Sequence, residues 1–305
     1  MKKVFMFSGQ GAQYVGMCKD LYEQYDCVKN IFNEADEVLG YKLSEIMFEN
    51  EELLNDTLYT QVAMYTMYAA ILEVLKELNI EAEYSMGLSL GEYGALLHNE
   101  VYDFKTGLKL LQVRGKVMQV ASSKVTGKMS AILGMETDTL LSIIDGVDGY
   151  VKIANYNTYG QLVISGETEA VLQVNELALE QGAKRAILLN TSGPFHTEIM
   201  KEASASLESY LEGVTLLEPT HKLLVNTTGD FYKGNMKQEL VDQITNSVMF
   251  YQMIEKLLEE GVDTFIEIGP KKTLCSFVKK VNRKVNILNV EDVDSLQKTV
   301  EKLEV

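Results

Sequence analysis

Hydrophobic and polar positions along the chain follow two repeats, one typical of buried strands and one typical of amphipathic helices. Short apolar runs, which we expect to be strands, occupy residues 3–8, 83–88, 221–226, 263–268 and 285–289. Longer segments with a helical period lie between them, at 57–79, 90–98, 103–123, 237–260 (broken near 246–247), 272–280 and 292–303. Strands that alternate with helices predict a parallel sheet covered on both faces.

The stretch 127–190 has a different order of elements. We expect strands at 128–135, 151–155, 162–165 and 184–190, with helices at 137–144 and 168–182. This β-α-β-β-α-β order is the ferredoxin-like pattern. The sequence therefore predicts an α/β fold with a parallel-sheet large subdomain, residues 1–126 and 191–305, and an inserted ferredoxin-like small subdomain, residues 127–190.

Composition narrows the class of protein. The chain has 305 residues, 46% of them hydrophobic and 24% charged, as in ordinary globular proteins. A net charge of -16 argues against partners such as nucleic acid or an anionic membrane. Three cysteines without metal-ligand spacing suit a reducing compartment. No apolar run approaches the roughly 20 residues that a membrane span needs, so we expect a cytoplasmic protein, and a monomer.

The pentapeptide Gly-Leu-Ser-Leu-Gly at 87–91 is the first candidate for chemistry. It follows an apolar strand and precedes a helix, which is the setting of the G-x-S-x-G nucleophile elbow of α/β-hydrolase-like sheets. The helix that begins there directs backbone N–H groups toward a developing oxyanion. We therefore interpret Ser89 as a nucleophile rather than as part of a chance Gly-Ser-Gly turn.

The base for such a serine must be one of 3 histidines. His98 lies nine residues after Ser89, on the opposite face of the predicted helix and about 13 Å along its axis. His221 follows Pro219 at the start of a predicted strand, where a surface role is more common. His196 lies in a Gly-Pro loop between a strand and a helix, and such loops often carry catalytic groups. By elimination, His196 is the candidate general base.

Arg114 lies inside the predicted helix 103–123, and every residue three or four positions away is apolar. A cation on such a stripe faces the interior, where isolated burial is costly, so it needs an anionic partner. That partner is either a protein carboxylate or the carboxylate of a substrate held by the guanidinium fork. Spacing alone leaves both readings open.

Several segments, in order and over essentially the whole chain, resemble the malonyl-CoA:acyl-carrier-protein transacylases of fatty-acid synthesis. The matching segments are Ser8–Gln13, Gly87–Glu92, Gln112–Gln119, Gly127–Gly134, Gly160–Gly166, Gly193–His196 and Glu267–Pro270. The resemblance implies that malonyl-CoA is the substrate, acyl carrier protein is the partner, and no cofactor is required.

Two positions depart from the family pattern: Leu88 stands where most members have histidine, and Ser247 replaces the proline of an Asn-Pro-Val segment.

The resemblance also implies roles for single residues. Ser89 would be acylated, His196 would move its proton, and Arg114 would bind the free malonyl carboxylate. The backbone N–H groups of Gln10 and Leu90 would form the oxyanion hole. A main-chain carbonyl near Asn246 would orient the histidine.

An acidic carrier needs a local basic patch on this acidic chain. Residues 271–284 contain no acid and six basic side chains: Lys271, Lys272, Lys279, Lys280, Arg283 and Lys284. We interpret them as part of a carrier-docking surface, with coenzyme A phosphates as a second possible user; a solvated helix face is the alternative.

Three rival functions share parts of this pattern. A serine thioesterase or esterase would share the elbow, but such chains usually place their histidine after the last strand, and they lack the arginine. A free-standing polyketide-synthase acyltransferase would share every site residue. An inactive carrier-binding scaffold would not need the intact serine, histidine and arginine.

Overall fold

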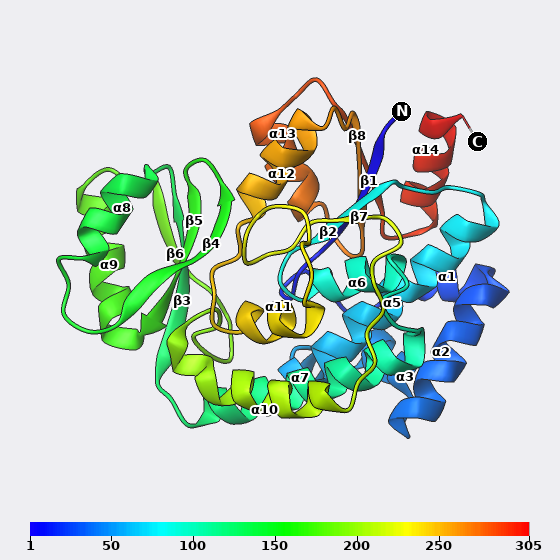
Figure 1. The fold of residues 1–305 in the computed structure, drawn as a ribbon, viewed down its shortest axis with the longest axis horizontal. Helices are drawn as coiled ribbons and strands as arrows, with labels where there is room; N and C mark the ends of the chain where they lie inside the picture. Colours follow the sequence, from blue (N-terminus) through cyan, green and yellow to red (C-terminus); the bar gives the residue numbers. More distant parts are fainter. Residues whose placement is uncertain (305) are drawn as a thin grey trace.

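The computed structural model describes residues 1–304, and its larger sheet is parallel (Figure 1). The strand order is β7-β2-β1-β8-β9. The strands are β1 Lys3–Phe7, β2 Tyr84–Gly87, β7 Lys222–Leu223, β8 Thr264–Ile268 and β9 Asn286–Val290. Strands β1, β2 and β8 are buried almost throughout, as expected for a parallel sheet with helices on both faces. The predicted α/β fold class is confirmed.

The two faces of this sheet have separate cores because alternate side chains of a strand point in opposite directions. Phe5 and Phe7 of β1 pack on the side of the long helices α5 and α7. Val4 and Met6 pack on the side of α12 and α13.

The helices around the parallel sheet are α1 Lys19–Gln24, α2 Asp26–Leu39, α3 Leu43–Glu49, α4 Glu51–Leu54, α5 Thr57–Glu77, α6 Gly91–His98, α7 Phe104–Ser123, α10 Lys201–Glu212, α11 Met236–Gln243, α12 Phe250–Glu259, α13 Thr273–Val281 and α14 Val293–Leu303, with a 3-10 turn at Glu198–Met200.

The second sheet is antiparallel, with the strand order β4-β5-β3-β6. It consists of β3 Gly127–Leu133, β4 Val151–Thr158, β5 Gln161–Glu167 and β6 Arg185–Leu188, and of helices α8 Thr137–Ile144 and α9 Thr168–Glu180. Both helices cover one face of the sheet and share a core with it. Figure 1 shows this ferredoxin-like unit to one side of the parallel sheet. The element order is as predicted, while the subdomain bounds of 127–190 stay a prediction.

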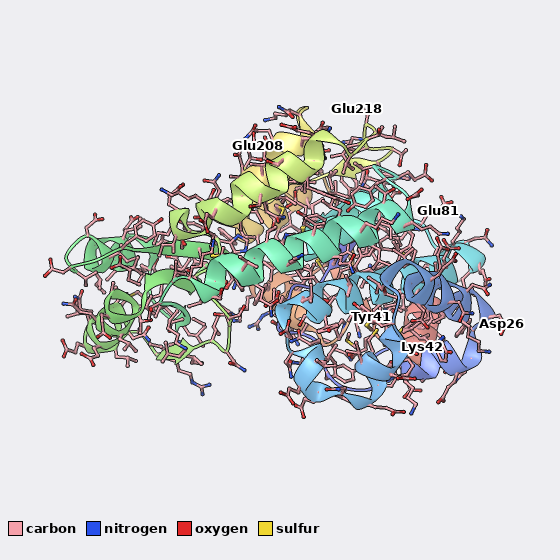
Figure 2. The ribbon with its side chains drawn as sticks, turned by 90° about the horizontal axis from the view of Figure 1, so that it is seen from below. Asp26, Tyr41, Lys42, Glu81, Glu208 and Glu218 are labelled. Carbon is pink, nitrogen blue, oxygen red and sulfur yellow. The ribbon has the colours of Figure 1, made fainter. Side chains whose placement is uncertain are left out.

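Sequence periodicity missed two features. The predicted strand 221–226 contains only the two residues of β7, because the chain turns away after Leu223 and Leu224 forms an isolated bridge with Phe231. Helices α1 to α4 and α10 were not assigned from the sequence. Figure 2 shows α10 alongside the long helix α7, with Glu208 of α10 directed away from it.

Among residues 1–304, no helix has the length and apolar character of a bilayer span.

Candidate active site

Ser89 lies at the point where β2 ends and α6 begins, and its backbone is left-handed, with φ 53°. Flanking glycines permit this sharp turn. A Cβ on Gly91 would lie 2.0 Å from the carbonyl oxygen of Phe7, and one on Gly87 would lie 2.0 Å from the backbone of Gly91. Neither distance is compatible with a side chain. Strain at Ser89 is typical of functional positions and needs support from its surroundings.

Asn226 supplies part of that support. Its Nδ2 donates to the carbonyl oxygen of Gly87 at 2.7 Å, and its Oδ1 accepts from the backbone N–H of Ser89 at 2.7 Å. The Asn226 side chain is fully buried, and its bond to Gly87 is shielded from water, while the bond to the partly exposed Ser89 is only partly buried. Asn226 was not among the predicted site residues. The available signal was its place at the end of the predicted strand 221–226, on the carboxyl edge where α/β sheets bind ligands.

His196 meets Ser89 from the loop before α10. Its Nε2 lies 2.8 Å from Ser89 Oγ, and its Nδ1 lies 2.9 Å from the main-chain oxygen of Gln243. A carbonyl can only accept, so Nδ1 carries the hydrogen and Nε2 is left as the acceptor for the serine proton. The hydrogen bond at 2.9 Å comes from Gln243, the last residue of α11, and the exposed Asn246 lies three residues farther along the chain. A role of Asn246 in orienting the histidine stays a prediction.

Burial and then the positive charge of Arg114 lower the pKa of His196 from 6.5 to about 4. The main-chain acceptors at Gln243 and Asn246 oppose this shift only partly. The imidazole is therefore neutral at pH 7 and able to accept a proton.

Arg114 points from α7 into the same site, with only 1% of its surface exposed. Its Nη2 lies 3.5 Å from Ser89 Oγ and 3.1 Å from Gln243 Oε1. The guanidinium carbon lies 5.0 Å from the ring centre of Tyr93, within the range of a cation–π contact. Nε is buried and has no hydrogen-bond partner. Within residues 1–304, no carboxylate lies within 4.0 Å of this guanidinium, so the alternative of a protein carboxylate as its ion-pair partner is not found.

The predicted oxyanion donors lie in the two loops that flank the serine. Leu90 directly follows Ser89, and Gln10 follows β1. In the part of the chain that the structure describes, neither backbone N–H has a protein acceptor. The side chain of Gln10 is anchored separately, by donating to Thr57 Oγ1 at 3.1 Å. Free N–H groups beside a nucleophile are suited to stabilising an oxyanion.

The two remaining histidines lie outside this site. The rings of His98 and His221 are 4.8 Å apart, at a cavity of about 720 Å³ that both residues line. Burial lowers the pKa of His98 to about 3, with a further contribution from His221.

Leu88, beside Ser89, is half-buried and packs on the core under α12. Across residues 1–304, no cluster of three or more His, Cys, Asp or Glu side chains could hold a metal.

The six basic residues of the predicted docking surface are all exposed. Lys271 Nζ donates to the carbonyl oxygen of Gly11 at 3.2 Å, in the loop that carries Gln10. Lys280 Nζ donates to Gln161 at the start of β5, which connects α13 with the antiparallel sheet. None of the six belongs to an ion pair within the described residues, so their charges are available to an acidic partner.

Comparisons with known proteins agree with this geometry. The family described as "Acyl transferase domain" matches residues 4–304. The malonyl CoA-acyl carrier protein transacylase of Bacillus subtilis is 41% identical over 99% of this chain and 97% of its own. The crystal structure of the Clostridium perfringens transacylase of that name is 43% identical, covers 100% of this chain and 98% of its own, and superposes with a TM-score of 0.96. A malonyl-transacylase in complex with its type II polyketide acyl-carrier protein is 34% identical, covers 99% of this chain and 100% of its own, and has a TM-score of 0.96. The chain therefore belongs to the acyl transferase family, among its malonyl CoA-acyl carrier protein transacylases.

Proposed function

We propose that Ser89 carries malonyl as an ester between coenzyme A and the phosphopantetheine thiol of an acyl carrier protein, in the cytoplasm and for fatty-acid synthesis. One observation carries this proposal: a single hydroxyl oxygen, Ser89 Oγ, lies within reach of both His196 Nε2, at 2.8 Å, and Arg114 Nη2, at 3.5 Å. A nucleophile, its base and a carboxylate receptor therefore converge in one place.

The first half-reaction forms the ester. Ser89 Oγ attacks the thioester carbonyl while His196 Nε2 takes the hydroxyl proton, and the negative oxygen is held by the N–H groups of Gln10 and Leu90. The C–S bond then breaks, and His196 returns the proton to the departing coenzyme A thiolate. In the second half, the carrier thiol gives its proton to His196 and attacks the ester carbonyl; the C–O bond to Ser89 then breaks, and His196 returns the proton to Ser89 Oγ. These steps need no redox change, and we expect ping-pong kinetics.

Arg114 gives the site its preference for acyl groups with a free carboxylate. Its guanidinium is buried without a carboxylate partner, so malonyl supplies the missing anion, while acetyl would leave the cation unpaired. Arg114→Ala should therefore lose malonyl transfer much more than acetyl transfer. An unchanged malonyl-to-acetyl preference in this variant would show that the arginine does not bind the carboxylate.

A mass-spectrometric experiment tests the intermediate directly. Incubation with malonyl-CoA, in the absence of carrier, should add one malonyl group to Ser89, and Ser89→Ala should show none. Hydrolysis without carrier that exceeds transfer with carrier would instead favour a thioesterase. A wild-type chain with no adduct and no transfer would support the scaffold reading.

The basic surface on and around α13 supports carrier docking as part of this proposal. Lys279 and Lys280 are exposed and unpaired by acids, and Lys280 bridges to the small sheet. Reversing both charges should raise the Michaelis constant for the carrier more than that for malonyl-CoA. Equal increases for both substrates would assign the patch to coenzyme A phosphates instead.

A polyketide carrier is a second candidate partner, because one structural relative was solved with such a carrier. The proposed chemistry is identical for both carriers. Transfer rates to a fatty-acid carrier and to a polyketide carrier, measured side by side, distinguish the two.

We further propose that the chain acts as a monomer, which size measurements in solution can test.

A further inference from the structure

One residue outside the predicted site, Gln243, contacts Ser89, His196 and Arg114. Its main-chain oxygen accepts from His196 Nδ1, as described above. Its side-chain Oε1 accepts from Arg114 Nη2 at 3.1 Å. Its Nε2 donates to the carbonyl oxygen of Ser89 at 3.0 Å and to Glu92 Oε2 at 2.7 Å. Gln243 is fully buried, and its bonds to His196, Arg114 and Glu92 are buried as well.

The orientation of the Gln243 amide determines whether it can hold the arginine. Arginine has only donors, so the atom that faces it must be Oε1, and Nε2 must then face acceptors on the other side. Glu92 Oε2 is one of two acceptors there, and it receives the shorter bond. Without it, the amide would lose one of the two acceptors that keep its oxygen directed at Arg114 and would retain only the longer bond to Ser89.

Glu92 itself is held firmly on α6. It is fully buried, and its Oε2 also accepts from the backbone N–H of Asn226 at 3.2 Å. Asn226 is the residue that clamps the turn at Ser89. The carboxyl group therefore has a fixed position relative to both the nucleophile and the amide that contacts the arginine.

We propose that Glu92 is a positioning residue: through the Gln243 amide it holds the Arg114 guanidinium beside Ser89, and so contributes to the preference for acyl groups with a free carboxylate. The inference depends on the proposed role of Arg114 and identifies what places that arginine. Glu92 touches neither the reacting atoms nor, in this geometry, the guanidinium itself.

The ionisation state of Glu92 fits this role. Burial, and then the charge of Glu239, raise the pKa of Glu92 well above its usual value, and Arg114 opposes this only weakly. The raised pKa favours the protonated form of Glu92, and that form adds no negative charge beside the arginine. Glutamine at position 92 would have nearly the same shape, would be neutral, and would still offer an oxygen to Gln243 Nε2.

The test compares kcat/KM for acylation by malonyl-CoA and by acetyl-CoA in the full-length chain. Glu92→Leu removes the acceptor, and Gln243→Met removes the amide while keeping the main-chain oxygen for His196. Each should lower the malonyl-to-acetyl ratio about tenfold, the usual scale for one hydrogen bond to a charged group. Glu92→Gln should keep most of the wild-type ratio. The double variant should lose no more than Gln243→Met alone, because both changes break one chain of contacts.

Glu267→Leu is the matched control, because Glu267 is also fully buried but accepts from the backbone N–H groups of Leu274 and Cys275 at the start of α13. It should lower the melting temperature without changing the ratio. Equal losses with both acyl-CoAs in Glu92→Leu, or a ratio in Glu92→Gln as low as in Glu92→Leu, would overturn the proposal. If Glu92→Leu does not fold, an unchanged ratio in Gln243→Met overturns it. Failure of the proposed function is visible separately, as a wild-type chain without malonyl preference.

Discussion

The low pKa of His196 makes a specific prediction about the pH dependence of acylation. Burial and Arg114 lower that pKa to about 4, so the general base should stay unprotonated far below pH 6.5. The rate at which Ser89 is acylated should therefore be level from pH 8 to about pH 5, and should fall only with a midpoint near pH 4. A histidine of ordinary pKa would give a midpoint near pH 6.5.

Arg114→Met should move this midpoint upward, and the structure limits by how much. Arg114 Nη2 and His196 Nε2 both lie near Ser89 Oγ, at 3.5 and 2.8 Å, so they are at most about 6 Å apart. Two charges at that distance repel by about 3 kcal/mol at an effective dielectric constant of about 20. The whole displacement of the pKa corresponds to about 3 kcal/mol, and burial is its larger cause. Arg114 therefore supplies less than half of the contributions that lower the pKa, and the acceptors at Gln243 and Asn246 cancel part of their sum. We expect the midpoint to rise by roughly one pH unit, less than the unscreened repulsion alone would give.

A neutral ester measures this effect without requiring carboxylate binding. The burst of p-nitrophenol from p-nitrophenyl acetate would be followed against pH in the wild type and in Arg114→Met, over the range in which circular dichroism stays native. Arg185→Met removes an exposed arginine of β6 and should leave the midpoint unchanged. His196→Ala should abolish the burst. Identical midpoints in the wild type and Arg114→Met, or a wild-type midpoint near pH 6.5, would refute the reasoning.

Three further predictions follow from single contacts. The pKa of His98 is lowered from 6.5 to about 3, so the unfolded chain binds more protons than the folded chain between those values. His98 should therefore lower folding stability by about 1.6 kcal/mol from pH 6.5 to pH 5; in urea titrations at both pH values His98→Leu should remove this share and leave the similar share of His196. Asn226→Ala leaves two buried backbone groups at the Ser89 turn without partners, which should cost about 1–3 kcal/mol in urea titration and slow acylation. Gly91→Ala forces a Cβ against Phe7 and should prevent native folding, seen as loss of the cooperative thermal transition.

The sequence revealed the chemical groups of the site better than the contacts that hold them. Ser89 was predicted because an elbow is a local pattern, and Arg114 because a cation on an apolar helical stripe is conspicuous in sequence. Gln243 and Asn226 were not predicted, because each acts on a residue more than 130 positions away and neither lies in a local motif. The break predicted near 246–247 lies between α11 and α12, and it puts Gln243 at the end of a helix.

The geometry of the site depends on contacts within the chain that hold two strained residues in place. Ser89 and His196 both have left-handed backbones, with φ of 53° and 60°, a conformation that costs a residue with a side chain about 1–3 kcal/mol. Glycine would relieve that cost at either position but could supply neither a hydroxyl nor an imidazole. The strain persists because buried hydrogen bonds from Asn226 and Gln243 fix both residues. If Ser89 and His196 act as the proposed nucleophile and base, contacts of this kind align them without closure of the site, and acyl selection then depends on whether the incoming group brings a carboxylate to Arg114.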